Sequence, residues 1–314
     1  MKKTWAIIFV LTWTLGMATS ALSADAPSKV RIAYASRSSS ALPQYMALQK
    51  GFFKAEGLDV EIIQMNPRLG ATAVVNGDVS FATPFTSTFR GVLQGFPMKL
   101  VFVHIKKGPY YVMVRPEIKD VQQLKGKKIG VATIKGTDQL VAEEMLQAKG
   151  FNTSLLQAVA IGDGPVRMQA LISGAVEAVC LAPPHDLMLR KLGYNALVGP
   201  PEVGLPSAGM LTSDRLIKEN PQIVRRTLKA LLRSHYHIVE NRQDSIQTLI
   251  KWLPQPLDVA EHSYDAELKN LNRDGLLTDA EIEAIIERVG EKKRPLDEVR
   301  DFSFARAALK ELGR

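Results

Sequence analysis

Two stretches of similar pattern decide the fold: VRIAYASRSS (residues 30–39) and KIGVATIKGT (residues 128–137). Each is a short β-rich run followed by a turn rich in hydroxyls or glycine, where a helical pattern begins. A strand that feeds a helix through such a turn is typical of α/β units with parallel strands. The sequence therefore predicts an α/β unit at each stretch.

The similarity continues downstream of both stretches. NGDVSFATP (76–84) is echoed by SGAVEAVCLAPP (173–184), and QKGFF by AKGFN, all in the same order and at a nearly constant offset. Repetition of this kind indicates two copies of one supersecondary unit. We therefore expect two similar α/β lobes.

The rest of the chain suggests how the lobes connect. Further strands are expected at 100–105 and 110–114, on either side of Lys107-Gly108-Pro109, and at 208–212 after the turn-rich PPEVGLPS. A chain that leaves the first lobe and later returns makes two crossings, which form a hinge beside a cleft. The predicted lobe 1 is 28–107 with 208–314, and lobe 2 is 108–207. Amphipathic helices at 221–241, 258–271 and 279–289 are expected to pack on lobe 1.

The N-terminus reads as a targeting segment. Lys2 and Lys3 precede an apolar run and then small residues, so residues 1–24 are expected to be a cleavable signal peptide. The formal net charge of +8 comes from basic residues that are scattered along the sequence, so they do not form the clustered basic patch that is typical of nucleic-acid-binding proteins. The single cysteine, Cys180, lies in an apolar run and is expected to be buried.

The loops that follow the predicted strands are the candidate ligand site, because ligands of open parallel sheets bind at the carboxyl ends of the strands. Ser and Thr also cap helices where no ligand is present, but several such loops on two related lobes favour a shared pocket. The expected ligand-binding residues are Ser36, Arg37, Ser38, Ser39, Thr83, Phe85, Thr86, Thr133, Lys135, Gly136, Thr137, Asp138, Asp163, Gly164, Pro184 and His185.

Lys135 is the most ambiguous of these residues. Its spacing to the neighbouring glycines does not fit a phosphate-binding P-loop. We expect residues 133–138 to form the second lobe's half of a ligand clamp, opposite Ser36 to Ser40. Arg37 and Lys135 favour a small organic anion, although Asp138 at the same helix start leaves a zwitterionic or neutral ligand open. Either Lys135 or the helix start makes the contact.

No pattern supports catalysis, a cofactor or a metal. A nucleophile elbow and paired cysteines are both missing from the sequence. Asn270, Asn272, Asp274 and Glu281 approach EF-hand spacing, but the first ligand lacks a carboxylate, and Asp-Gly between helices is a common turn. The histidines offer no paired metal ligands: His235 and His237 point to different helix faces, and the other three, His104 among them, are isolated.

Several segments of the sequence together resemble a known family. The segments at 36–62, 76–84, 114–131, 173–184 and 219–232, with GTD at 136–138, are similar to periplasmic substrate-binding proteins of ABC importers, of the nitrate/sulfonate/taurine (SsuA/TauA-like) and NMT1/THI5-like group. The resemblance implies a type II periplasmic-binding-protein fold, in which two α/β lobes on a two-segment hinge close on a small molecule. It also implies a monomer that delivers its ligand to an ABC permease and ATPase complex.

Two alternatives remain within this resemblance. An exported sensor subunit of the same fold would present its ligand to a membrane receptor. THI5-like pyrimidine synthases share the fold but carry a cysteine-rich motif and an active-site histidine, and a single cysteine argues against that activity. The sequence does not identify the ligand.

Overall fold

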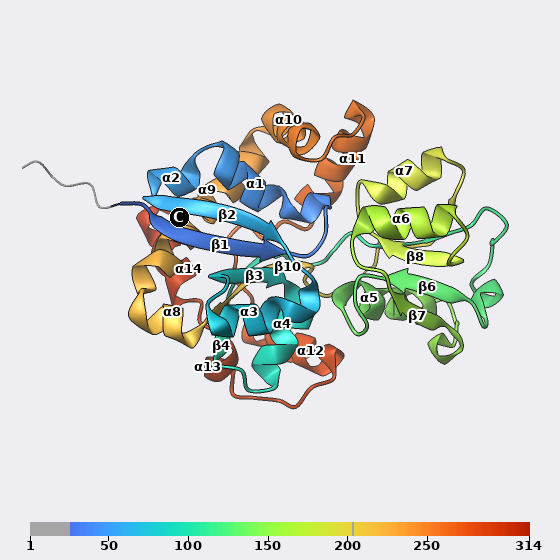
Figure 1. The fold of residues 1–314 in the computed structure, drawn as a ribbon, viewed down its shortest axis with the longest axis horizontal. Coiled ribbons are helices and arrows are strands. Elements are labelled where there is room, and N and C mark those ends of the chain that lie inside the picture. The colour runs from blue at the N-terminus through green and yellow to red at the C-terminus, as the bar shows by residue number, and fades with distance from the viewer. Residues whose placement is uncertain (1–25, 203) are drawn as a thin grey trace, which may run out of the picture.

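The computed structural model describes residues 26–202 and 204–314, and Figure 1 shows two lobes side by side. The expected signal peptide, residues 1–24, lies outside the described residues. Each lobe contains one five-stranded sheet covered by helices. This confirms the prediction of two α/β lobes.

The first sheet has the strand order β2-β1-β3-β10-β4. Its strands are β1 (Ser28–Tyr34), β2 (Leu58–Gln64), β3 (Phe81–Pro84), β4 (Met98–Ile105) and β10 (Ala208–Ser213). β1 pairs in parallel with β2 and β3, whereas β10 runs antiparallel to both β3 and β4. The strand that returns from the other lobe is thus inserted into this sheet.

The second sheet repeats this arrangement, with the order β7-β6-β8-β5-β9. Its strands are β5 (Tyr111–Val114), β6 (Lys128–Val131), β7 (Gln157–Ala160), β8 (Ala178–Leu181) and β9 (Asn195–Val198). β6 is parallel to β7 and β8, and the antiparallel strand is β5, which enters from the first lobe. Strands β6 and β8 hold the places of β1 and β3, as the sequence repeat requires.

The chain crosses between the lobes after β4 and again before β10. These two crossings are the two-segment hinge of the type II fold. The residue boundaries of the lobes stay a prediction.

Helices cover both faces of the first sheet (Figure 1), and the carboxyl end of β1 is buried on both sides. Val30 and Ile32 pack toward α9 (Pro221–Glu240) and α14 (Ser303–Glu311), and Ala33 packs in the cluster that contains α3 (Gly70–Asn76) and α4 (Phe85–Leu93). The long helix α9 buries residues such as Val224, Leu228 and Leu231, a three- to four-residue spacing that forms one apolar stripe.

The C-terminal helices pack mainly on the first lobe, as expected. They are α8 (Asp214–Glu219), α9, α10 (Arg242–Trp252), α11 (Leu257–Leu268), α12 (Asp279–Val289), α13 (Leu296–Val299) and α14. Helix α11 also contacts α7 (His185–Lys191) of the second lobe, where His262 Nε2 lies 3.0 Å from Asp186 Oδ2. This contact links the lobes at one edge of the interface.

The region with EF-hand-like spacing has a structural use. Glu281 caps α12 in a capping box with Thr278, and the Asn272 side-chain amide donates to the Leu276 carbonyl. Within the described residues, no group of three or more His, Cys, Asp or Glu side chains is arranged to hold a metal ion. No described helix is both long and apolar enough to cross a bilayer.

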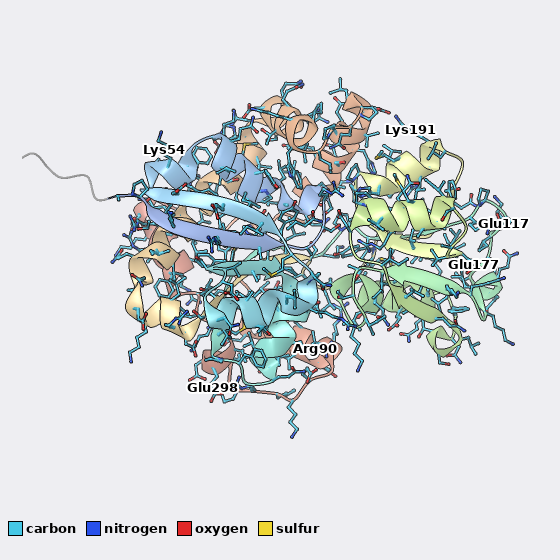
Figure 2. All side chains as sticks on the ribbon, in the orientation of Figure 1. Lys54, Arg90, Glu117, Glu177, Lys191 and Glu298 are labelled. Atoms are coloured by element: carbon cyan, nitrogen blue, oxygen red, sulfur yellow. The ribbon has the colours of Figure 1, made fainter. Side chains whose placement is uncertain are left out.

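The expectation that His104 is isolated is wrong. Its Nδ1 lies 2.9 Å from His235 Nε2, and both rings are fully buried between β4 and α9. The contact could not be predicted from the sequence, because the two residues come from elements that are far apart along the chain and that only the fold brings together. Elsewhere charged side chains spread over the outside of both lobes, as Figure 2 shows for Lys54, Glu117 and Glu298.

Candidate functional site

A cavity of about 80 Å³ lies between the lobes. Its wall comes from the loops that open α1 (Leu42–Gln49), α4, α5 (Thr137–Gln147), α6 (Gly164–Ile172) and α7. One buried water needs roughly 10–15 Å³ of such space, so the cavity has room for a few waters or one small solute. The candidate site is therefore where the strand-to-helix loops of the two sheets converge.

Most of the predicted site residues line this cavity. Those that do are Ser36, Ser38, Thr83, Phe85, Thr86, Thr133, Thr137, Asp138, Gly164 and His185. The others, which lie in the same loops but outside the lining, are Arg37, Ser39, Lys135, Gly136, Asp163 and Pro184. Sequence reasoning missed the aromatic walls Tyr34 and Tyr110 and, above all, Arg167.

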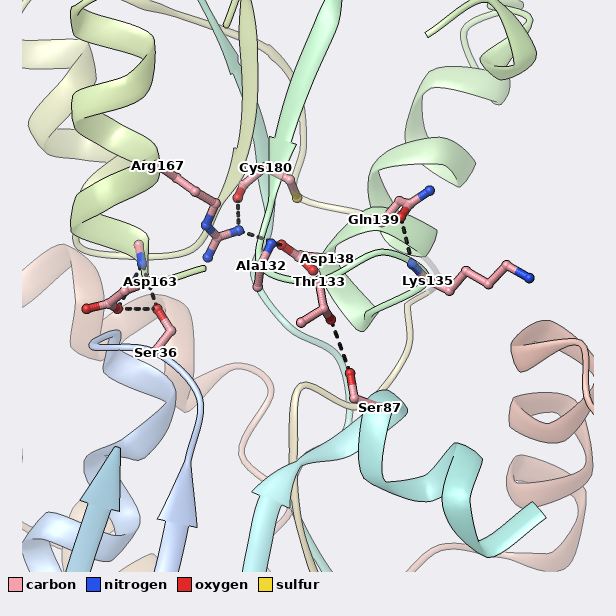
Figure 3. Close-up of polar contacts among 11 residues, drawn as sticks. Ser36, Ser87, Ala132, Thr133, Lys135, Asp138, Gln139, Asp163, Arg167 and Cys180 are labelled. Carbon is pink, nitrogen blue, oxygen red and sulfur yellow. Dashed lines mark hydrogen bonds and ion pairs between the residues drawn. The ribbon is translucent and has the colours of Figure 1, made fainter. Parts of the chain in front are cut away.

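The serine loop of the first lobe meets Asp163 of the second. Ser36 Oγ donates to Asp163 Oδ1 at 2.9 Å (Figure 3), and the Arg37 backbone N–H and Nε donate to the same carboxylate at 2.9 and 2.7 Å. Burial alone would raise the pKa of Asp163, but hydrogen bonds from Gln64, Arg37 and Ser36 outweigh it and hold the pKa at about 2. Arg37 is thus already paired with a carboxylate.

The 133–138 loop meets α4 rather than the serine loop. Thr137 Oγ1 donates to Thr86 Oγ1 at 2.6 Å, and the Ser87 and Thr133 hydroxyls lie 3.2 Å apart. The prediction that residues 133–138 lie opposite Ser36 to Ser40 is therefore wrong. The repeat aligns the lobes in sequence, but the lobes pack so that each loop faces a non-equivalent loop of its partner.

Lys135 lies on the outer side of its loop. Its side chain is exposed and points away from Arg167 in Figure 3, while its backbone carbonyl accepts from Arg90 Nη2 at 3.2 Å. Lys135 adopts φ 59°, the left-handed region that few non-glycine residues occupy. A Cβ on the next residue, Gly136, would lie 2.5 Å from Thr133 Oγ1, so the tight turn requires glycine there. Lys-Gly in this loop is a turn signature.

His185 is nearly buried beside Arg167 and Gly164. Burial and the nearby guanidinium lower its pKa to about 4, so its imidazole is neutral at pH 7. The charged side chains of the cavity lining in the described chain are then Arg167 and Asp138. Their ion pair has Nη1 and Oδ2 2.5 Å apart, with each side chain only 5% exposed.

Ser39 couples the lobe interface to a buried glutamate on α11. Its Oγ lies 3.0 Å from the Pro183 carbonyl oxygen of the second lobe and 2.7 Å from Glu267 Oε1. One hydroxyl has one proton and cannot donate to both. A protonated Glu267 resolves this, because it donates to Ser39 Oγ and leaves the Ser39 proton for Pro183. Burial raises the pKa of Glu267 to about 7, although the Ser39 bond opposes the shift.

We expect ligand binding to weaken as the pH rises through 7. Ionised Glu267 accepts the hydrogen bond of the Ser39 hydroxyl, so lobe closure loses the bond from Ser39 Oγ to the Pro183 carbonyl, about 1 kcal/mol or roughly fivefold in affinity. In Glu267→Gln the amide N–H mimics the protonated acid, so affinity measured calorimetrically at pH 6 and 8.5 should differ only in the wild type. Equal pH dependence in both proteins would contradict the relay.

Comparisons with known proteins agree with this geometry. The family model described as NMT1/THI5 like matches residues 38–245, more than half of the chain. Riboflavin-binding protein RibY of Chloroflexus aurantiacus is 25% identical over 226 residues, which cover 68% of this chain and 63% of that protein. The chain thus matches less than two thirds of that relative's length.

An enzyme and a binding protein are also similar to this chain. The 4-amino-5-hydroxymethyl-2-methylpyrimidine phosphate synthase THI13 of Saccharomyces cerevisiae is 24% identical over 234 residues, 68% of each chain. The structure of the alkanesulfonate-binding protein SsuA from Xanthomonas axonopodis pv. citri, bound to MOPS, has a TM-score of 0.72 and 19% identity, and covers 87% of this chain and 98% of that one. This structural likeness confirms the two-lobed binding-protein fold. Together with the family match, it establishes that the chain belongs to the NMT1/THI5-like family.

Proposed function

We propose that this protein is the extracytoplasmic solute-binding receptor of an ABC import system. The observation that carries the proposal is the cavity between the lobes, lined by helix-opening loops from both. Similarity to RibY and to SsuA, both named as binding proteins, supports it. The expected signal peptide supports a periplasmic location, where the receptor delivers its ligand to a permease and ATPase complex.

The proposed mechanism is hinge closure. Hydroxyls on both sides of the cavity bond directly across the interface, as at Ser36–Asp163 and Thr86–Thr137. A ligand that touches both lobes binds only when these contacts are formed, and this difference in affinity shifts the population toward the closed state. The closed, liganded form is the one that the permease recognises.

The ligand class that we propose is a small organic anion, a sulfonate or carboxylate. The first turns of α4, α5 and α6 line the cavity, and helix N-termini carry partial positive charge. Arg167 adds buried N–H donors, although Asp138 balances its charge, while Phe85 and Tyr110 supply apolar walls. Among the described residues, the cation of the lining is Arg167 rather than the expected Arg37 and Lys135, which lie outside the lining.

A thermal-shift screen of the exported protein against nitrate, sulfonates, carboxylates and pyrimidines tests the proposal. A ligand at about 100 times its dissociation constant adds roughly 2.7 kcal/mol, a rise of several degrees in melting temperature. Small-angle scattering should show compaction with the same ligand, and mass spectrometry should recover the ligand unchanged. Turnover of a pyrimidine precursor would favour the synthase function suggested by THI13, and absence of any stabilising ligand would overturn the receptor assignment.

A further inference from the structure

Arg167 is the one cationic side chain in the lining of the cavity, as far as the described residues show. It lies in the second turn of α6, and the residue is 4% exposed. A buried guanidinium needs partners for its N–H groups, because it cannot lose its charge. How those groups are used therefore indicates what the cavity is built to hold.

One nitrogen of Arg167 is fully occupied by the protein. Nη1 donates to Asp138 Oδ2 and to the Cys180 carbonyl oxygen, each at 2.5 Å. Asp138 is itself fixed, since its Oδ2 also accepts from the Ala132 backbone N–H at 2.6 Å. Figure 3 shows the guanidinium held between these two acceptors. Its plane and direction are thus set without any ligand.

The opposite edge of the same guanidinium is free. Nε is buried and has no partner, and Nη2 donates to no residue of the described chain. The N–H bonds of Nε and Nη2 on this edge are parallel and co-planar, a fork whose spacing matches the two oxygens of a carboxylate. The neighbouring groups leave this fork unopposed: Ser36 and Gly164 bond to each other and to Asp163, and His185 is uncharged at neutral pH.

The rest of the cavity limits the body of the ligand. Tyr34, Phe85 and Tyr110 present aromatic surface, and the volume of about 80 Å³ admits a solute of roughly half a dozen heavy atoms. Arg167 and Asp138 cancel as charges, so a single ligand charge has only the first turns of α4 to α6 to offset it. A second carboxylate would find no further cation in the described lining.

We propose that the Nε–Nη2 edge of Arg167 binds the carboxylate of a short aliphatic monocarboxylate, with Asp138 and the Cys180 carbonyl as positioning groups. This assignment rests on the receptor function proposed above and names its ligand class. It also gives Asp138 its role: the aspartate orients the arginine rather than contacting an ammonium group.

The test is calorimetric titration with matched series of ligands: straight-chain carboxylates from acetate to hexanoate, their primary amides and the corresponding alkanesulfonates. We expect one carboxylate of intermediate length to bind at least tenfold more tightly than its amide and its sulfonate. Arg167→Lys retains the charge but loses the fork, and should weaken this binding by at least tenfold. Lys135→Ala, an exposed change in a neighbouring loop, should stay within twofold.

The outcomes separate the two proposals. Equal binding of carboxylate and amide, or undiminished binding by Arg167→Lys, would overturn the role of Arg167. If a sulfonate, or a pyrimidine from the thermal-shift screen, binds and compacts the protein while carboxylates do not, the receptor function stands and the ligand class is wrong. If nothing in the screen or in any series binds, both fail. Because the ligand series is read on wild-type protein, the test does not depend on a variant that folds poorly.

Discussion

The free energy of unfolding should fall by about 3 kcal/mol per pH unit between pH 6 and 5. Burial lowers the pKa values of His104, His185 and His235, the last two to about 4, and raises that of Glu267 to about 7. Below pH 6.5 these three histidines become protonated in the unfolded chain but stay neutral in the native protein. Native Glu267 keeps one proton that the unfolded chain releases above about pH 4.5. The unfolded state therefore binds about two more protons than the native state. Each of them lowers the free energy of unfolding by about 1.4 kcal/mol per pH unit as the pH falls.

The His104–His235 pair gives this prediction its geometric basis. His235 Nδ1 lies 2.8 Å from the Asn272 carbonyl oxygen, so it must be the donor, and His235 Nε2 then accepts from His104 Nδ1. His104 Nε2 is buried without a partner. A proton added to His235 Nε2 would face another N–H, and one added to His104 Nε2 would find no acceptor in the described chain.

Urea unfolding from pH 7.5 to 4.5 measures the effect. The double variant His104→Phe/His235→Leu should be less stable overall but nearly independent of pH between 6 and 5, because His185 and Glu267 then cancel. Glu267→Gln should steepen the wild-type slope by about 1.4 kcal/mol per unit. His237→Gln, a partly exposed histidine on the same helix, serves as the matched control. A double variant with the wild-type slope would show that the buried pair does not titrate as proposed.

Gly275→Ala should destabilise the protein by about 2–5 kcal/mol. Gly275 has φ +74°, where an L-residue costs about 1–2 kcal/mol. A Cβ there would lie 1.8 Å from Phe102 Cε2, and this ring is fully buried against His104 and His235, so overpacking adds about 1–3 kcal/mol. The same position carries the Asp-Gly turn that resembled part of a calcium loop.

Gly290→Ala is the matched control for this prediction. Gly290 ends α12 with φ +72°, but a Cβ there meets no atom within 4 Å. Its cost should therefore be that of the backbone alone, about 1–2 kcal/mol. Denaturant unfolding of both variants isolates the contact with Phe102. Equal losses would mean that the ring moves aside, and the packing argument would be wrong.

The repeat and the strand patterns predicted most of the fold. The strands expected at 100–105 and 208–212 became β4 and β10 within two residues, and the expected helix at 279–289 is α12. These predictions succeeded because strand and helix periodicities are local: neighbouring side chains decide which face is buried. The same locality placed the loops after the strands, and so most of the cavity wall, in the candidate site.

The sequence did not predict the role of Arg167, because this role depends on two partners that are distant in sequence, Asp138 and the Cys180 carbonyl. From the sequence alone, an arginine in a helical stretch is expected to be exposed to solvent. The sequence did not predict the role of Glu267 either, because its link to the other lobe runs through the Ser39 hydroxyl.

The sequence by itself determined that this chain forms two α/β lobes with a hinge, and that hydroxyl-rich and glycine-rich loops gather at their strand ends. Only the tertiary structure decided which loops face each other, that Lys135 points outward and that Arg167 is buried in the cavity wall beside Asp138. The physical reason is that secondary structure follows from local periodicity, whereas the state of a buried charge follows from contacts between elements that are far apart along the chain.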